Sequence, residues 1–319
     1  MINGDPPGAL CPRVGMAVVC EAKLLSCNNL MTCCMLPCGR RAILRSSTKR
    51  RWKAAALQMT STADVDANLS KALKLIREAA AAGADLIALP ENFAYLRREG
   101  EPAAYKQDLD GELVGAMRKE ARSLGRYLLL GSIPERVPRS RKVFNTSILI
   151  GPGGGLRAYY RKMHLFDIDV RGGATLEESR AVAAGDRPVV VKTPLGKLGL
   201  SICYDLRFPE LYRRLTLAGA ELLFVPAAFT AFTGPHHWLP LLRARAIENQ
   251  CWVVAPAQVG KHGPGRQSHG ESAIIDPWGQ VVKRLPKRQG WIMAEIDMKQ
   301  VEKVRRGLPC LDHIRKELI

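Results

Sequence analysis

The chain has 319 residues, 47% hydrophobic and 24% charged, which is typical of a globular protein with a sizeable core. No apolar run is long enough to cross a bilayer, so we expect a soluble protein that is not bound to a membrane. The net charge is +18, but residues 54–319 hold no long basic run and no basic stripe interleaved with aromatic residues, which argues against nucleic-acid binding.

Residues 1–50 differ in composition from the rest. They have few acidic residues, end in a basic stretch that contains serine, and include Cys11, Cys20, Cys27, Cys33, Cys34 and Cys38. This pattern is typical of a mitochondrial transit peptide, and equally of a disordered tail or of sequence from an upstream start. The cysteines lack the paired spacing of a zinc site. The other three cysteines, in a much longer stretch, indicate a reducing compartment. We therefore predict an N-terminal extension (1–50), a domain (51–319) and a cytoplasmic or mitochondrial location.

Regular patterns begin near Trp52. In the first half we predict strands at 53–59, 85–90, 127–133, 143–150 and 156–160, and helices at 66–82 and 113–124. The first helix carries Leu69, Leu73 and Ile76 at helical spacing on one face, and glycine follows each helix.

The second half repeats part of the first. Residues 82–93 align with residues 218–229, and each segment follows a predicted helix and is followed by a further helix and strand, at 241–249 and 252–258 in the second copy. Two such units predict an α/β fold with two sheets packed face to face and helices outside. Glu91 and Ala227 occupy matching strand exits, so we expect both to border the site.

Three chemically distinct side chains follow predicted strands: Glu91, Lys162 and Cys203. Taken singly, they read as a solvated carboxylate, a surface amine and a small buried hydrophobe. Taken together, they can act on a carbonyl group. A carboxylate whose pKa is raised by burial can serve as the base for a thiol, and a lysine can stabilise an oxyanion. Cys203 lies between a strand and the helix opened by Pro209, whose N-terminus would favour the thiolate.

Three motifs carry a resemblance to a known family: Leu89-Pro-Glu91-Asn-Phe, Tyr160-Arg-Lys162-Met-His-Leu-Phe-Asp and Ile202-Cys203-Tyr-Asp-Leu-Arg-Phe-Pro-Glu. Over residues 52–319 the chain resembles the nitrilase, or carbon–nitrogen hydrolase, superfamily, and its Nit branch in particular. The resemblance implies an αββα four-layer sandwich that dimerises as αββα-αββα. It also implies a catalytic Glu-Lys-Cys triad, here Glu91, Lys162 and Cys203.

The resemblance extends to further residues. It implies that Glu178 supports the lysine, although Glu177 is adjacent, and that the backbone N–H of Tyr204 helps to hold the oxyanion. The pair Tyr204-Asp205 after the cysteine favours an amide substrate over a nitrile. We expect substrate contacts from Arg207, His237 and Ala227, and a basic rim for an anionic substrate from Arg171, Arg207, Lys261 and Arg266.

The predicted protein is a thiol amidase, a hydrolase of carbon–nitrogen bonds other than peptide bonds. It would form a cysteine thioester with release of ammonia and use no cofactor or metal. The Nit branch implies a small carboxylate-bearing amide such as deaminated glutathione, and a homodimer or higher homo-oligomer. An ω-amidase, a carbamoylase and a non-catalytic interaction module remain alternatives. Arg171 and Glu271 replace residues usual in the branch, which leaves the substrate preference open.

Overall fold

The computed structural model of the chain describes residues 49–98, 101, 104–169, 175–315 and 317. All of them belong to one unit, Ser46–Ile319. The predicted extension over residues 1–50 therefore lies outside the described residues, except for Lys49 and Arg50, and its boundary stays a prediction. None of the described helices is both long and apolar enough to cross a membrane.

Two large sheets form the centre of this unit. In order across the larger sheet, the described strands are β14 (Arg266–His269), β13 (Ala257–Gly263), β1 (Arg51–Met59), β2 (Leu86–Ala88), β3 (Tyr127–Arg136), β4 (Val143–Ile150) and β5 (Leu156–Arg161), with β17 (Gly290–Asp297) also paired to β1 and β8 (Val182–Ala183) to β4. The smaller sheet contains β16 (Val281–Arg284), β15 (Ala273–Ile275), β12 (Trp252–Ala255), β11 (Leu222–Phe224), β10 (Gly196–Leu200) and β9 (Val189–Thr193). A separate two-stranded ribbon pairs β6 (Asp167–Asp169) with β7 (Thr175–Glu177).

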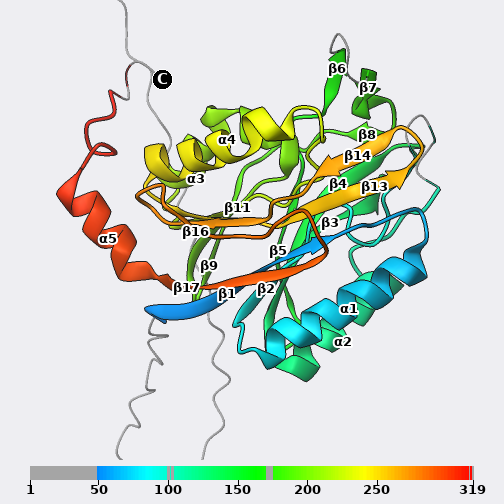
Figure 1. Cartoon of the computed structure of the whole chain (residues 1–319), viewed down its shortest axis with the longest axis horizontal. Coiled ribbons are helices and arrows are strands. Elements are labelled where there is room, and N and C mark those ends of the chain that lie inside the picture. The colour runs from blue at the N-terminus through cyan, green and yellow to red at the C-terminus, as the bar shows by residue number, and fades with distance from the viewer. Residues whose placement is uncertain (1–48, 99–100, 102–103, 170–174, 316, 318–319) are drawn as a thin grey trace, which may run out of the picture. The chain divides into compact units, whose positions relative to one another are not determined.

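Helices cover the outer faces of both sheets. The described α-helices are α1 (Val65–Ala81), α2 (Glu112–Leu124), α3 (Pro209–Leu217), α4 (Gly234–Asn249) and α5 (Met298–Gly307), and two short 3-10 helices are η1 (Glu178–Arg180) and η2 (Cys203–Arg207). Helices α1 and α2 lie on the larger sheet, and α3 and α4 lie on the smaller one (Figure 1). The described unit is therefore helix, sheet, sheet, helix, which confirms the predicted αββα sandwich. Its dimerisation stays a prediction.

Strand β1 shows how the sequence sets these layers. Ala54 and Ala56 point into the core between the two sheets, whereas Ala55 and Leu57 point to the core under α1 and α2. Successive side chains of a strand face opposite sides, so a strand that is buried on both faces reads as an unbroken apolar run. The run from Ala54 to Leu57 is such a stretch of strand.

Helices α1 and α2 confirm the predicted helices to within two residues. The side chain of Asp64 caps α1 by accepting from the Ala67 N–H at 2.9 Å, which satisfies one of the free donors of the first turn. Gly125 ends α2 in the left-handed conformation, at φ 63°, where glycine carries no steric penalty.

Two predicted elements of the second half were wrong in extent. The predicted strand over 252–258 is two strands, β12 and β13, because Pro256 interrupts it and the chain passes from the smaller sheet to the larger one at that point. The predicted helix over 241–249 begins earlier, at Gly234, with Pro235 in its first turn and Pro240 inside it. A proline in the middle of a segment normally argues against a helix, and for this reason the predicted range began only after Pro240.

Candidate active site

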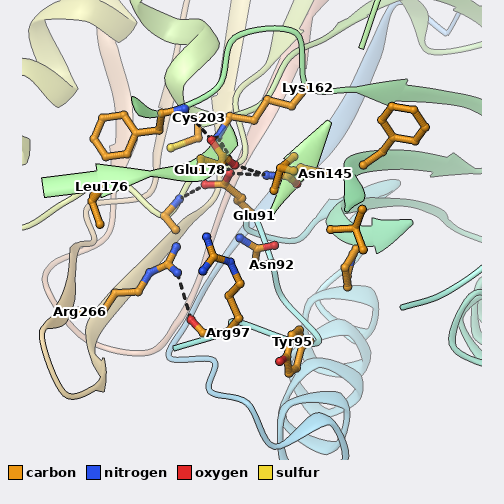
Figure 2. Close-up of a pocket in the computed structure, with 16 residues that line it drawn as sticks. Glu91, Asn92, Tyr95, Arg97, Asn145, Lys162, Leu176, Glu178, Cys203 and Arg266 are labelled. Carbon is orange, nitrogen blue, oxygen red and sulfur yellow. Dashed lines mark hydrogen bonds and ion pairs between the residues drawn. The ribbon is translucent and has the colours of Figure 1, made fainter. Parts of the chain in front are cut away.

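The ends of three strands meet between the two sheets. Glu91 follows β2 after Pro90, Lys162 follows β5, and both strands belong to the larger sheet. Cys203 follows β10 of the smaller sheet and opens η2. The face-to-face packing of the sheets thus brings together the three side chains that the sequence singled out, as Figure 2 shows.

Lys162 is held by two carboxylates. Its Nζ lies 3.1 Å from Oε1 of Glu91, and 3.0 and 2.8 Å from the two carboxylate oxygens of Glu178. The lysine is 2% exposed. Burial alone would lower its pKa, but the charges of Glu178 and Glu91 outweigh burial and raise the pKa well above its ordinary value. Lys162 is therefore a fixed cation, and Glu178 contacts it as the resemblance implied.

The carboxylate of Glu91 accepts hydrogen bonds from several sides. Oε1 accepts from Lys162 and from Nδ2 of Asn145 at 2.8 Å, and Oε2 accepts from the backbone N–H of Ala228 at 2.7 Å. Burial would raise its pKa, but the ammonium of Lys162 and these donors outweigh burial and lower it. The raised pKa expected from the sequence was wrong, because Lys162 was not known to lie against this group.

Cys203 sits in a strained turn against Glu91. Its backbone is left-handed, at φ 48°, and its N–H donates to the carbonyl of Pro226 at 2.9 Å. Burial and then the charge of Glu91 raise the pKa of the thiol well above its usual value, although Lys162 acts in the opposite direction. The expected thiolate was wrong, because burial and the neighbouring Glu91 carboxylate both disfavour it. The resting thiol is protonated beside an ionised carboxylate.

Asn145 is a site residue that the sequence reasoning missed. It is 4% exposed, and its Nδ2 donates to Oε1 of Glu91 and, at 3.3 Å, to Oε1 of Glu178. It therefore holds both carboxylates that hold Lys162. The available signal was the polar run Asn145-Thr146-Ser147 inside the apolar strand β4, since buried polar side chains require partners.

A buried aspartate joins the turn that contains Cys203 to the segment that carries Lys162. Asp205 is fully buried and accepts from the Tyr160 hydroxyl at 2.8 Å, from the Ile202 N–H at 2.8 Å and from the His164 N–H at 3.1 Å. Its Oδ1 also lies 2.7 Å from Nδ1 of His164. Because Tyr160 and His164 lie on either side of Lys162, Asp205 fixes the lysine relative to the cysteine.

Two cavities are both lined by Cys203. The larger has a volume of about 690 Å³, including its open part, and is lined by Glu91, Asn92, Tyr95, Arg97, Pro134, Val143, Phe144, Asn145, Lys162, Phe166, Leu176, Glu178, Val182, Cys203, Ala228 and Arg266. The smaller, of about 200 Å³, is lined by Phe166, Cys203, Tyr204, Arg207, Ala228, Phe229, Thr230 and Thr233. A thiol, an ionised carboxylate and a fixed cation at this junction suit attack on a carbonyl group.

The carbon–nitrogen hydrolase family model matches residues 53–306 of this chain. The chain belongs to the carbon–nitrogen hydrolase family. The resemblance drawn from the three motifs is thereby confirmed, and so is the predicted enzyme class, a hydrolase of carbon–nitrogen bonds other than peptide bonds.

Relatives and solved structures agree with this assignment. A deaminated glutathione amidase of Synechocystis is 46% identical over 263 residues, which are 82% of this chain and 97% of that protein. A deaminated glutathione amidase of Homo sapiens is 40% identical over 314 residues, which are 96% of this chain and 95% of that protein. The crystal structure of the Caenorhabditis elegans NitFhit protein matches with a TM-score of 0.79 and 41% identity, over 86% of this chain and 67% of that one.

Two other predicted residues of the hydrolase line the smaller cavity, and a third contacts one of them. Tyr204 and Arg207 line it. The Arg207 guanidinium lies over the rings of Phe229, at 5.1 Å, and Tyr204, at 5.8 Å, and its Nη1 lies 3.2 Å from Nδ1 of the exposed His237. Partial burial and the charge of Arg207 lower the pKa of His237. His237 therefore contacts the site through Arg207 and does not line the cavity itself.

Of the other residues singled out in the sequence, only Arg266 lines one of the two cavities. Ala227 is fully buried and pairs with Ala257, and its neighbour Ala228 lines both cavities, so the predicted contact is displaced by one residue. Arg266 lines the larger cavity, whereas Lys261 is exposed and lines neither. Glu271 also lies outside both cavities, with Oε2 3.4 Å from Nε2 of His269. Arg171 lies outside the described residues.

Proposed function

We propose that the hydrolase is a thiol amidase in which Cys203 is the nucleophile, Glu91 the base and Lys162 the cation that stabilises the oxyanion. The observation that carries the proposal is the Glu91 carboxylate, which is bound to Lys162 at 3.1 Å and has its pKa lowered, beside a thiol whose pKa is raised. A proton can then move from sulfur to Glu91 only as the sulfur attacks, so the nucleophile is formed together with the new bond.

The reaction would run in two halves. The sulfur bonds to the amide carbon while Glu91 takes the thiol proton, and Lys162 and the Tyr204 N–H hold the resulting oxyanion. Glu91 passes the proton to the amide nitrogen, the carbon–nitrogen bond breaks, and an amine leaves a thioester on Cys203. Water then gives a proton to Glu91 while its oxygen bonds to the carbonyl carbon. The carbon–sulfur bond breaks, the acid leaves, and Glu91 returns the proton to the sulfur, which restores the thiol.

The substrate we propose is deaminated glutathione or a close analogue. It is the substrate named for the relatives from Synechocystis and Homo sapiens, which match nearly their whole length. Its scissile amide joins a five-carbon oxo acid to cysteinylglycine, so the first product would be a dipeptide. Release of ammonia, expected from the sequence, would apply only to a primary amide substrate.

The decisive experiment combines turnover with detection of the thioester. Cys203→Ala should abolish release of the dipeptide, because the attacking sulfur is gone, while the far-ultraviolet circular dichroism stays unchanged. Mass spectrometry of the rapidly quenched wild-type enzyme should show the acyl group on the peptide that contains Cys203. Cys310→Ala, which removes a thiol outside both cavities, is the matched control. Turnover by Cys203→Ala close to the wild-type rate would refute the mechanism.

Location and assembly belong to the same proposal. The few cysteines of the domain support a reducing compartment, cytoplasmic or mitochondrial. The αββα family resemblance supports a homodimer. Sedimentation of the purified enzyme and imaging of a tagged full-length chain would test these two points.

A further inference from the structure

The proposed base and the proposed nucleophile are both held by the segment from Pro226 to Ala228, which follows β11 of the smaller sheet. The carbonyl of Pro226 accepts from the Cys203 N–H at 2.9 Å. The N–H of Ala228 donates to Oε2 of Glu91 at 2.7 Å. Glu91 itself follows β2 of the larger sheet. The approach of the carboxylate to the thiol therefore depends on what joins this segment to the backbone of Glu91.

Gln258, on β13, is hydrogen-bonded to both of them. Its backbone N–H donates to the carbonyl of Ala227 at 2.8 Å. Its Nε2 donates to the backbone carbonyl of Glu91 at 3.0 Å. With the bond from the Ala228 N–H to the Glu91 carboxylate, these contacts close a ring that holds Glu91 at its backbone and at the end of its side chain. A carboxylate held at both places has little freedom to rotate away from the thiol.

The side chain of Gln258 is itself fixed. It is fully buried, and β1 lies between β13 and β2 in the larger sheet, so the side chain crosses the end of β1 to reach Glu91. There its Oε1 accepts from the Ser61 N–H at 3.0 Å, and its Nε2 also donates to the Ser61 hydroxyl at 2.8 Å. That hydroxyl donates in turn to the carbonyl of Phe93 at 2.7 Å. Because Nε2 faces acceptors and Oε1 faces a backbone donor, only one orientation of the amide satisfies them.

From these contacts we infer that Gln258 is a positioning residue of the amidase, which holds Glu91 where its carboxylate can take the proton of Cys203. The inference rests on the proposed function, in which Glu91 is the base. Gln258 lines neither cavity, so it would act on the rate through Glu91 and not through contact with the substrate. Loss of its amide should therefore lower kcat with little effect on KM.

Gln258→Met tests the inference, because it nearly keeps the volume of the side chain and removes its hydrogen bonds. kcat should fall by about 10- to 100-fold, since a displacement of about 1 Å in such a site can cost as much. The acid limb of kcat/KM should move upward, because burial raises the pKa of a Glu91 carboxylate that has moved away from the Ala228 N–H and from the ammonium beside it. The titratable and charged groups that line the cavity with Glu91 are unchanged in this variant: Lys162, Glu178, Cys203, Arg97 and Arg266.

Gln58→Met is the matched control. Gln58 is a fully buried glutamine on the neighbouring strand β1. Its Oε1 accepts from the Ser272 N–H at 2.7 Å, and its Nε2 donates to two backbone carbonyls, each at 2.7 Å. Both variants should lose a similar amount of stability in urea, whereas only Gln258→Met should change kcat and the pH profile. If Gln258→Met does not fold, Gln258→Asn replaces it, because a side chain shorter by one methylene draws the donor back from Glu91.

Titration of Glu91 separates this inference from the proposed reaction. In the full-length Cys203→Ala protein, labelled with ¹³C at the glutamate Cδ, the Glu91 resonance is assigned by its loss in Glu91→Gln. Gln258→Met should raise the pKa of Glu91, and Gln58→Met should not. That result supports the inference whether or not deaminated glutathione proves to be the substrate. An unchanged Glu91 titration, an unchanged kcat in the folded Gln258 variant, or an equal loss of kcat in Gln58→Met would overturn it.

Discussion

At the scale of single residues, the site depends on which groups carry charge at rest. Burial disfavours the charged form of Glu91, Lys162 and Cys203 alike, but only the thiol is neutral, because the carboxylate and the ammonium stabilise each other at 3.1 Å. The carboxylate that we propose as the base is therefore ionised before the substrate arrives. Cys203, the proposed nucleophile, rests as a thiol, which is the less reactive form toward oxidants.

Lys162 should control both the rate and its pH dependence. In the wild-type enzyme the active form of Glu91 is the carboxylate, and its pKa is lowered, so kcat/KM should stay level from neutral pH down to below the ordinary range of a glutamate. Lys162→Met removes the main group that lowers this pKa, so burial should move the acid limb of the profile upward. The loss of an oxyanion donor should also lower kcat by about 100-fold or more.

Two further variants check this interpretation. His237→Ala should mainly alter KM, because His237 contacts Arg207 and lies outside both cavities. Lys162→Met combined with Glu178→Gln removes one of the two carboxylates that the lysine holds, which protects the fold from a second uncompensated charge. An acid limb that does not move in either Lys162 variant would show that Glu91 is not the titrating base.

The meeting of Glu91, Lys162 and Cys203 at strand ends could be predicted from the sequence, but their protonation states could not. Glu91, Lys162 and Cys203 follow strands within recognisable motifs. The direction of each pKa shift depends on contacts between residues that are far apart along the chain, such as Glu91 with the Ala228 N–H at 2.7 Å. Asn145 was missed for the same reason, since its partners come from other elements.

At the scale of elements, close packing and buried hydrogen bonds hold the strand ends in place. Gly131 of β3 shows the closeness of this packing, since a Cβ there would lie 2.0 Å from the carbonyl oxygen of Leu89, two residues before Glu91. Asp205, with its hydrogen-bond donors Tyr160, His164 and Ile202, forms a cluster that joins η2 to the segment around the end of β5. The sequence predicted the strands, but these contacts between their ends appear only in the folded chain.

Asp205→Asn should separate Lys162 from Cys203 by loosening this cluster. The amide nitrogen would face backbone donors in place of a carboxylate oxygen, which should cost about 2 kcal/mol of the free energy of unfolding, as measured in urea. kcat should fall by at least about tenfold because the oxyanion donor is displaced, with less effect on KM. Tyr160→Phe removes one donor and should cost about 1 kcal/mol. A destabilised Asp205→Asn enzyme with unchanged kcat would limit Asp205 to a role in stability.

At the scale of the whole molecule, the site exists only where the two sheets meet. The repeat of residues 82–93 at 218–229 predicted two related units, and the strands within the two segments, β2 and β11, do lie in different sheets. Glu91 follows the strand in one sheet and Ala228 follows the strand in the other. The backbone N–H of Ala228 donates a hydrogen bond to the Glu91 carboxylate. The sequence could not predict the exchange between sheets at Pro256 or the pairing of β17 with β1, because both depend on contacts across the whole unit.

The domain should remain active without the first 48 residues. The described residues that line the two cavities all lie at or beyond Glu91, and β1 begins at Arg51. Just before it, the Lys49 N–H donates to the carbonyl of Pro194 at 2.6 Å, and its Nζ lies 2.8 Å from Asp85. A chain that starts at Lys49 should therefore match the full-length chain in kcat/KM and in unfolding midpoint.

A chain that starts at Trp52 tests how much the edge of the domain contributes. It loses the Lys49 contacts and the pairing of Arg51 with Asp297, whose side chains lie 3.1 Å apart. The basic side chain of each ion pair, Lys49 or Arg51, is largely exposed to solvent. Loss of both pairs should therefore lower the free energy of unfolding by only about 1 kcal/mol. kcat/KM should stay at the full-length value, because the sheet contacts of β1 from Trp52 onward remain. If the chain that starts at Lys49 is itself insoluble or inactive, the first 48 residues belong to the folded enzyme and the predicted boundary is wrong.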